Sequence, residues 1–345
     1  MSPAPSRIVL PDFFASCPFE SSTINPHFKA AGAESSAWVN SHVVFNDRKR
    51  AALMQNSYEL LVAYAFPWAS YEDFRTLCDF INLLFVFDEV SDDQNGKDAG
   101  YTSKIFMDAM RNIDNGDHSE LTELCKEFKA RFSRRLSPQV NERFLQHLQS
   151  YTDCVAQEAD LRERGEILDL ESYVILRREN SAVRPCFDLV EYIMDFDIPQ
   201  EVLDHPVFSE MYWASVDLVC WSNDVYSYNV EQAKGHRGSN VVTVLMNEKN
   251  LDLQAACDYV GVYYQELMDR YLSAKARLPS WGPEIDAAVG KYVLAEAQFV
   301  RGNLDWSFDT PRYFGPQRDQ IKKSRIVTLT PAPKKFGSDS GSESE

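Results

Sequence analysis

The chain has 345 residues, 44% of them hydrophobic, and its 35 basic and 52 acidic side chains give a formal net charge of −17. The apolar content allows a large core and argues against overall disorder. A surface this acidic also argues against direct binding of nucleic acid or of anionic membranes, because both need a basic surface.

Compartment is indicated by the cysteines and by the N-terminal sequence. Seven cysteines are scattered along the chain without a CxxC pair, which is typical of free thiols under reducing conditions. The N-terminus has no apolar stretch of secretory length, and no run approaches the roughly 18–20 apolar residues of a membrane span. We therefore expect a cytoplasmic protein with no membrane insertion.

The predicted elements are almost all helical. Residues 1–35, rich in Pro, Ser and Asn, are expected to form an irregular N-terminal arm, and residues 36–315 to form one helical domain. Apolar residues recur there at three- and four-residue spacing. The expected helices are 50–66, 71–87, 138–165, 208–235, 251–278 and 284–308.

Strand signals are rare, and VVTVLM (241–246) is the only candidate. The last 13 residues, PKKFGSDSGSESE, are of low complexity, and we expect residues 316–345 to be a disordered tail. The sequence predicts an all-α fold, a single helical bundle around an apolar cavity.

A cluster of acids ends the second of these helices, in INLLFVFDEVSDDQNG (81–96). Asp88 and Asp92 are four residues apart and project from one helix face, with Glu89 beside them. Carboxylates this close repel each other, and Mg²⁺ is a hard cation that takes such oxygen ligands. A solvated helix end is the alternative. An EF-hand is excluded, because placing the glycine at loop position 6 puts Ser and Thr where the loop needs Asp and Glu.

A second constellation is NDVYSYNVE (223–231). Asn223, Ser227 and Glu231 are spaced by four residues, a step of only about 40° beyond a full turn, so they share one stripe of the helix. An amide oxygen, a hydroxyl and a carboxylate on one stripe could bind another hard cation. The alternative is the polar face of an amphipathic helix.

Four side chains could bind an anion. Arg177 follows an apolar segment, Lys234 lies one turn after Glu231, and Arg312 is next to Tyr313. Arginine binds phosphate oxygens in a bidentate manner, lysine acts as a point charge, and tyrosine adds a hydroxyl donor. The alternative for each basic residue is an ion pair at the surface.

Together these motifs resemble the class I terpene synthases, specifically the fungal (basidiomycete-type) sesquiterpene synthases. The acidic motif of that family is matched by DEVSD (88–92), and its NSE motif by NDVYSYNVE. Its diphosphate-sensing arginine lies 46 residues before the NSE asparagine, which is Arg177 here, and its Arg-Tyr pair is matched by Arg312 and Tyr313. The resemblance runs from about residue 10 to about residue 315.

The chain departs from the family pattern at two places. Many relatives have a basic residue just before the NSE glutamate, where this chain has Val230, and Lys234 or Arg237 could supply that charge. After the sensor arginine, some relatives have Asp and Gly at the positions of Asn180 and Ser181.

The resemblance implies an enzyme, a carbon–oxygen lyase acting on phosphates. It would ionise and cyclise farnesyl diphosphate to a sesquiterpene hydrocarbon or alcohol and release diphosphate. It implies three Mg²⁺ ions, for which Mn²⁺ could substitute, and a monomer or a homodimer. The implied metal ligands are Asp88, Asp92, Asn223, Ser227 and Glu231, and the implied diphosphate-binding residues are Arg177, Lys234, Arg312 and Tyr313.

Aromatic side chains could stabilise a carbocation in the cavity. Phe85, Tyr226 and Trp306 are the candidates, with core packing as the alternative for each. Two other functions compete with cyclisation. A trans-prenyltransferase would carry a second Asp-rich motif in place of the NSE motif, and a catalytically degenerate isoprenoid-binding helical protein would keep only a pocket.

Overall fold

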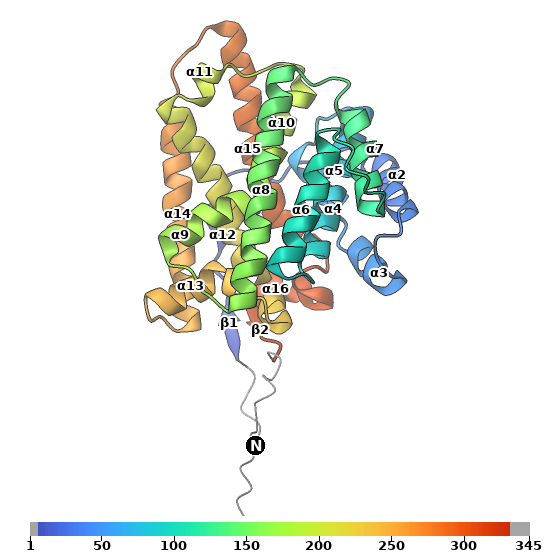
Figure 1. Cartoon of the computed structure of the whole chain (residues 1–345). Helices are drawn as coiled ribbons and strands as arrows, with labels where there is room; N and C mark the ends of the chain where they lie inside the picture. Colours follow the sequence, from blue (N-terminus) through green and yellow to red (C-terminus); the bar gives the residue numbers. More distant parts are fainter. Residues whose placement is uncertain (1–5, 332–345) are drawn as a thin grey trace, which may run out of the picture.

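The computed structural model describes residues 6–331, and within this range α-helices pack against one another around a common core (Figure 1). The all-α prediction is confirmed, and the seven cysteines are free thiols, six of them buried. Across residues 6–331, no helix combines the length and apolarity needed to cross a membrane. The elements are β1 (Arg7–Val9), α1 (Phe13–Ser16), α2 (Phe28–Ser41), α3 (Asp47–Gln55), α4 (Tyr58–Ala65), α5 (Tyr71–Ser91), α6 (Gly96–Met110), α7 (Glu120–Phe132), α8 (Pro138–Arg164), α9 (Leu170–Asn180), α10 (Val183–Met194), α11 (Gln200–Leu203), α12 (Pro206–Lys234), the 3₁₀ turn η1 (Arg237–Ser239), α13 (Val241–Glu248), α14 (Leu253–Ala276), α15 (Pro283–Asp309), the 3₁₀ turn η2 (Gly315–Gln317), α16 (Arg318–Ser324) and β2 (Ile326–Thr328).

Helix α5 is a central helix of the bundle. It begins after Ser70, whose side chain accepts a hydrogen bond from the Asp73 backbone N–H and so caps the first turn. Leu77, Phe80 and Leu83 are completely buried, as expected for a helix surrounded by neighbours on several sides. Because the helix continues to Ser91, its last turn carries Asp88 and Glu89, which are partly buried.

The long helices α8 and α12 follow the sequence prediction closely. Each has a proline in its first turn, where the missing N–H costs nothing, and each ends at a glycine in the left-handed conformation. The φ angles of these glycines are 66° at Gly165 and 90° at Gly235. These ends fix where the last turns of both helices point, and α12 contributes residues to the main cavity.

The strand prediction for residues 241–246 is wrong, because this segment forms helix α13. Asn240 caps the helix by accepting from the Val242 backbone N–H. Val241, Val244 and Leu245 are completely buried. A short run of β-branched residues fits a buried helix as well as a buried strand, and the sequence pattern alone does not separate the two.

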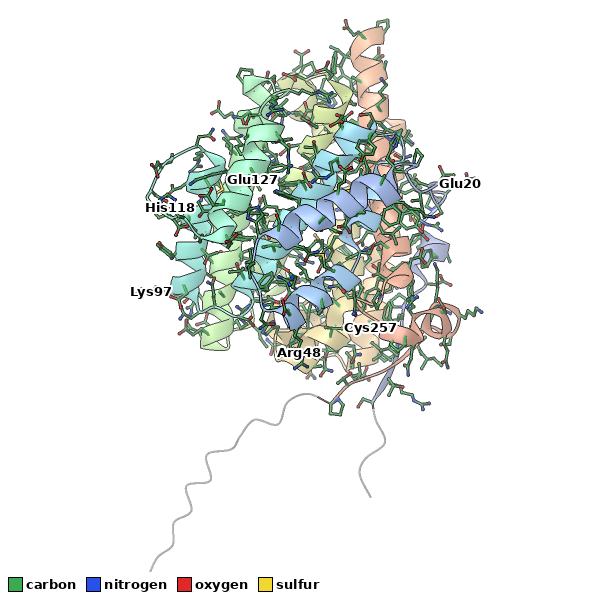
Figure 2. The ribbon with its side chains drawn as sticks, turned by 90° about the vertical axis from the view of Figure 1, so that its right-hand side faces the viewer. Glu20, Arg48, Lys97, His118, Glu127 and Cys257 are labelled. Atoms are coloured by element: carbon green, nitrogen blue, oxygen red, sulfur yellow. The ribbon has the colours of Figure 1, made fainter. Side chains whose placement is uncertain are left out.

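The expected irregular arm is shorter than predicted, because helix α2 begins at Phe28. This helix crosses α4 and α5, and the Ser35 hydroxyl donates to the buried Asp79 carboxylate at 2.7 Å. Figure 2 views this face, with Glu127 of α7 near α2; the Trp38 indole N–H donates to Glu127. Glycine and serine give α2 a weak helical signal, which tertiary packing overrides.

The expected disordered tail is also shorter than predicted. Helix α16 and strand β2 lie within residues 316–345, and β2 pairs antiparallel with β1, with Ile8 opposite Val327. Ile321 and Val327 are buried. This pairing joins the two ends of the chain, so no local pattern could reveal it; residues 332–345 lie outside the described range.

Candidate active site

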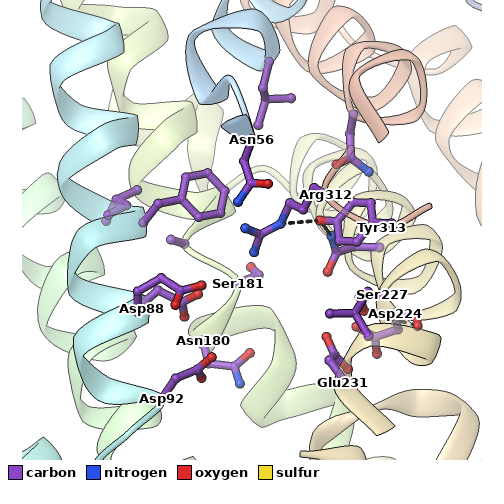
Figure 3. A pocket seen from close by; sticks show the side chains of 18 of the residues that line it. Asn56, Asp88, Asp92, Asn180, Ser181, Asp224, Ser227, Glu231, Arg312 and Tyr313 are labelled. Carbon is purple, nitrogen blue, oxygen red and sulfur yellow. Dashed lines mark hydrogen bonds between the residues drawn. The ribbon is translucent and has the colours of Figure 1, made fainter. Parts of the chain in front are cut away.

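The main cavity lies between α5 and α12 and has a volume of about 560 Å³. Figure 3 shows its two facing walls, with Asp88 and Asp92 on α5 and Ser227 and Glu231 on α12. The interior wall is apolar and includes Ile81, Leu84, Phe85, Val183, Val219 and Phe299. The volume is in the range of about 300–1,000 Å³ typical of small-molecule sites.

The α5 wall carries several carboxyl groups that repel one another. Asp88, Glu89 and Asp92 all line the cavity. Burial raises the pKa of Asp88 to about 8, and repulsion from Asp92 adds to the increase. A cation bound between these carboxylates would relieve the repulsion, so the electrostatics of this wall fit a metal site.

Two lysines lie against this acidic turn. Lys49 of α3 approaches Asp93 at 2.7 Å and Glu89 at 3.6 Å. Lys234 lies 3.7 Å from Asp92 and is 48% exposed. The structure thus brings Lys234 to the acidic motif as well as to the cavity rim, while Asp93, which is 76% exposed, points away from the cavity.

The α12 wall brings the predicted stripe together. Asn223, Ser227 and Glu231 all line the cavity. Burial raises the pKa of Glu231 to about 7, and the Asn240 amide, which donates to the Glu231 carboxylate at 2.8 Å, opposes this increase. Asn240 is the N-cap of α13 and had no signal in the sequence that tied it to Glu231.

Arg177 lines the cavity and is held by two residues of the NSE segment. Its Nε donates to the Asp224 carboxylate at 2.8 Å, and a terminal nitrogen donates to the Asn223 amide oxygen at 2.9 Å. Asp224 also accepts from the Tyr173 hydroxyl and from the Val241 backbone N–H. Asp224 therefore fixes Arg177 to α12 and to the start of α13, a function that the sequence did not reveal.

Arg312 and Tyr313 lie between the two walls (Figure 3). The Asn223 amide donates to the Tyr313 hydroxyl oxygen at 2.8 Å, and Arg312 Nε donates to the same oxygen at 3.2 Å. A terminal nitrogen of Arg312 donates to the Tyr58 hydroxyl at 2.7 Å. The Arg-Tyr pair is thus connected to Asn223, although 89 residues separate Asn223 from Arg312 in the sequence.

Two of the three aromatic candidates line the cavity. Phe85 and Trp306 face it, whereas Tyr226 does not. Tyr226 is 2% exposed and packs against Phe308 and Phe314 in the core. The proposed cavity position of Tyr226 is therefore wrong, because it precedes Ser227 by one residue and is rotated by about 100° from it around the helix.

The prediction also missed Glu158 of α8, which lines the cavity together with Arg177 and accepts from the Asn180 amide at 2.5 Å. Burial and the charge of Asp92 raise the pKa of Glu158. A signal was present in the sequence, because Glu158 follows Tyr151 and Val155 at helical spacing on an otherwise apolar face. The side chain of Arg237 lies outside the described part of the structure.

The residues present form two incomplete sets of oxygen ligands. In the described residues, no three His, Cys, Asp or Glu side chains converge into a ready-made metal cage. Carboxylate, amide and hydroxyl oxygens are nevertheless the ligands that Mg²⁺ takes, and Mg²⁺ usually completes its shell with water and substrate phosphates. The donor set therefore fits a hard divalent cation that binds together with a phosphate-bearing ligand.

Comparison with protein families gives one match to this region. The family described as terpene synthase family 2, C-terminal metal binding, matches residues 79–270. This range contains the acidic turn of α5 and the oxygen-ligand stripe of α12, and it ends before the Arg312–Tyr313 pair.

Similar proteins cover almost the whole chain. A Coprinopsis cinerea protein named linoleate 10R-lipoxygenase COP4 is 49% identical over 332 residues, 96% of both chains. The bifunctional terpene synthase Agr4 of Cyclocybe aegerita is 47% identical over 347 residues, 100% of both chains. The viridiflorene synthase Agr2 of the same organism is 41% identical, over 96% of this chain and 88% of that protein.

Solved structures share the fold at lower sequence identity. Germacradien-4-ol synthase from Streptomyces citricolor superimposes with a TM-score of 0.74 at 22% identity, over 84% of this chain and 96% of that one. Hedycaryol synthase in complex with HEPES gives 0.76 at 21% identity, over 87% and 98%. The helical architecture is therefore shared well beyond the range of close sequence similarity.

Proposed function

The chain belongs to the terpene synthase family, and we propose that it is a sesquiterpene synthase that ionises and cyclises farnesyl diphosphate with release of diphosphate. The substrate class is a prenyl diphosphate, which the family establishes. The C15 chain length is supported by relatives named sesquiterpene synthases, which are 38–41% identical over 89–95% of this chain. The product would be a cyclic hydrocarbon or alcohol.

One observation carries this proposal. Two sets of oxygen ligands, on α5 and α12, face each other across an apolar cavity, and Arg312 lies between them. Such an arrangement suits a ligand with an anionic head at the charged rim and an apolar chain in the interior. It also explains how a chain of net charge −17 could bind an anionic substrate, because bound cations would dominate the local field.

Three Mg²⁺ ions are proposed as the cofactor, with Mn²⁺ as a substitute. Asn223, Ser227 and Glu231 would hold one ion, and Asp88 with Asp92 would hold the other two. Bound Mg²⁺ supplies Lewis-acid stabilisation of the charge that develops on the diphosphate leaving group. Asn240 would keep the Glu231 carboxylate oriented toward the cavity by its 2.8 Å hydrogen bond.

The diphosphate would be bound by Arg177, Lys234, Arg312 and Tyr313. Two of these are anchored before any ligand arrives, since Arg177 is bound to Asp224 and the Tyr313 hydroxyl accepts from Asn223. Pre-positioned donors stabilise developing charge without reorganisation during the reaction. The half-exposed Lys234 lies at the cavity rim and would act as a point charge on the diphosphate oxygens nearest to solvent.

The cavity walls would control the fate of the ionised substrate. When the bond between C1 and the diphosphate oxygen breaks, both electrons leave with the oxygen, and an allylic cation remains in the cavity. The apolar side chains exclude water and fold the chain so that one double bond lies close to the cation. Phe85 and Trp306 present aromatic faces that would stabilise the positive charge.

The function is tested by incubating the purified protein with farnesyl diphosphate and Mg²⁺, with EDTA as the control, and analysing the extract by gas chromatography–mass spectrometry. A metal-dependent cyclic C15 product is expected. Geranyl and geranylgeranyl diphosphates in parallel reactions test the chain length. Absence of any product and of diphosphate release with all three substrates would contradict the proposal and favour an isoprenoid-binding protein.

A trans-prenyltransferase is not favoured. That reaction expects a second Asp-rich motif, whereas the facing set on α12 is an amide, a hydroxyl and one carboxylate. Two relatives that match nearly the whole chain are also named a terpene synthase and a viridiflorene synthase. Adding isopentenyl diphosphate to the assay separates the two reactions, because only chain elongation would consume it.

The name of the Coprinopsis cinerea relative raises a second candidate, oxygenation of linoleate. Non-haem iron oxygenases use two histidines and a carboxylate. Among the described residues that line the cavity, His236 is the only histidine. The donor set therefore favours a hard cation, and oxygen uptake in the presence of linoleate would be the observation that supports the second candidate.

A further inference from the structure

The guanidinium of Arg312 lies inside a group of four aromatic rings, which we call the aromatic box: Tyr58, Phe85, Trp306 and Tyr313. Its central carbon is 4.8 Å from the ring centre of Phe85, 5.3 Å from Tyr58, 5.5 Å from Tyr313 and 5.9 Å from Trp306. All four distances are within the range of cation–π attraction. The box therefore already holds a cation.

The box is built rigidly. The Tyr58 and Phe85 rings are stacked at 3.6 Å with an interplanar angle of 12°. The Trp306 indole N–H lies 3.1 Å from the backbone carbonyls of both Asn56 and Ser57, which fixes the third ring. Ser57, which precedes α4, has a φ of 46°, a left-handed conformation that is unfavourable for a non-glycine residue. Such a conformation persists only where the surrounding contacts fix the backbone.

Arg312 forms no close ion pair in this position. Within residues 6–331, no carboxylate oxygen lies within 4.0 Å of its guanidinium nitrogens. Its side-chain hydrogen bonds go to the hydroxyls of Tyr58 and Tyr313. Burial raises the pKa of Tyr58 to about 12, so this phenol stays neutral at neutral pH. Asp88 attracts Arg312 only from beyond ion-pair distance, and a guanidinium enclosed in this way has a strong tendency to bind an incoming anion.

We propose that the aromatic box is used by two cations in turn, the Arg312 guanidinium before substrate binds and the carbocation after ionisation. The diphosphate draws Arg312 out of the box, and the faces of Phe85, Trp306 and Tyr313, which line the cavity, become free for the hydrocarbon cation. Tyr58, which does not line the cavity, contributes the hydroxyl that holds Arg312. This proposal rests on the proposed function, since it needs a diphosphate ligand and an ionised substrate. It adds that Arg312 has two positions, one inside the box and one on the diphosphate, and that Arg312 occupies the box before substrate binds.

The exchange would connect substrate binding to cation stabilisation. While Arg312 occupies the box, a second positive charge there would be repelled, so the box cannot assist ionisation. Only a ligand that carries a diphosphate removes this repulsion. The box then becomes available at the same moment as the leaving group is bound.

Tyr58 is the positioning residue in this scheme. Its hydroxyl accepts the 2.7 Å hydrogen bond that holds Arg312 in the box, and the Asn56 amide donates to the same oxygen at 2.9 Å. Replacement by phenylalanine would keep the ring and remove only the hydroxyl. Tyr64, further along α4, offers a matched control, because its hydroxyl bonds to Asp309 and it does not line the cavity.

The first experiment observes Arg312 directly, by NMR of the full chain with ¹⁵N-labelled arginine. The Nε–H signal of Arg312, assigned with Arg312→Lys, should be displaced by the surrounding rings and should move when Mg²⁺ and inorganic diphosphate are added. Arg143, partly buried beside Glu191 and outside the cavity lining, serves as the unchanged control. An unchanged Arg312 signal, with binding confirmed by calorimetry, would overturn the exchange alone. Absence of diphosphate binding would instead overturn the proposed function.

The second experiment compares the affinity of Tyr58→Phe and Tyr64→Phe for inorganic diphosphate in the presence of Mg²⁺. Tyr58→Phe should bind about tenfold more tightly than the unmodified protein, because one hydrogen bond to a charged group no longer holds Arg312 in the box. Tyr64→Phe should bind with unchanged affinity. Tighter binding cannot result from a general loss of structure. Unchanged binding would overturn the proposal, and so would weaker binding by a Tyr58→Phe variant whose circular dichroism matches that of the unmodified protein.

Discussion

Both ends of helix α8 carry buried or partly buried charges, but these charges have different partners. Near its N-terminus, Arg143 lies against Glu191 and 3.5 Å from Asp188, and His147 lies 2.7 Å from Asp188. We call these four residues the paired cluster. Near the C-terminus, Glu158 faces the cavity together with Asp88, Asp92 and Glu231, and we call these four the acidic cluster.

Each acid of the paired cluster has a basic side chain beside it within the protein. Its two acids face an arginine and a histidine, and the Glu191 carboxylate also accepts from the Ile198 backbone N–H at 2.6 Å. Burial raises the pKa of Glu191 to about 7, and Arg143 opposes this increase. In the acidic cluster, neighbouring carboxylates add to the increase in the pKa of Asp88 and of Glu158. Buried charges that are paired stabilise a particular arrangement, whereas buried charges of one sign are retained when an external ligand compensates them.

The largest expected effect is on the acidic cluster. Asp88→Asn or Glu231→Gln should lower turnover of farnesyl diphosphate by about 10³-fold, because each removes a ligand charge from a metal site. Helical circular dichroism should be unchanged. We expect the metal-free Asp88→Asn protein to melt at a higher temperature than the unmodified chain, since the substitution removes repulsion from Asp92. Full turnover in both variants would contradict the metal assignment.

The same type of change in the paired cluster should affect stability and not chemistry. Glu191→Ala leaves Arg143 buried beside a cavity, and removal of one partner of a buried ion pair costs about 3–5 kcal/mol. Urea denaturation should show this loss in the free energy of unfolding. The folded fraction should retain its kcat, because Glu191 does not line the main cavity. A large loss of kcat at unchanged stability would mean that the comparison of the two clusters is wrong.

The acidic cluster should also give the metal-free protein a characteristic pH dependence. The folded pKa values of Asp88 (about 8) and Glu231 (about 7) lie above the usual values of unfolded carboxyls. The folded state therefore binds more protons, and stability is highest below about pH 4 for these groups and falls as the pH rises toward 8. Thermal melting of the unmodified protein and Asp88→Asn should show a shallower decline in the variant. An equal decline would show that Asp88 does not titrate in this range.

The affinity for Mg²⁺ should change with pH in the opposite direction to the stability of the metal-free protein. Mg²⁺ binds the deprotonated carboxylates, so its apparent affinity should rise between pH 6 and about pH 8. Calorimetric titrations at several pH values would measure this increase. Constant affinity over that interval would argue that the ligand set does not include the acids with raised pKa.

The smallest expected effect concerns Lys49, which supplies part of the counter-charge that the acidic turn has. Its ion pair with the exposed Asp93 should contribute at most about 1 kcal/mol to stability. Lys49→Gln should therefore leave the melting temperature almost unchanged. Mg²⁺ should bind a few-fold more tightly, because a positive charge 3.6 Å from Glu89 is gone. Weaker Mg²⁺ binding would indicate that Lys49 orients the acids.

Much of the fold was predictable because its signals are local. The spacing of apolar residues predicted α5, α8 and α12, and the glycines at 165 and 235 ended two of them at the predicted residues. The predictions failed where distant contacts decide the structure. Residues 241–246 are helical because tertiary packing buries them, and β2 is ordered by its pairing with β1 at the other end of the chain.

For the site, the sequence by itself determined the ligand chemistry. The four-residue spacing of Asp88 and Asp92, and of Asn223, Ser227 and Glu231, places each set on one face of a helix whatever the tertiary structure is.

The tertiary structure alone decided what these sets face. It directed Tyr226 into the core, brought Glu158 and Lys49 to the acidic turn, and closed four aromatic rings around Arg312. The physical reason is that the period of a helix is a local property of the backbone, whereas burial and electrostatic partners depend on helices that are distant in the sequence.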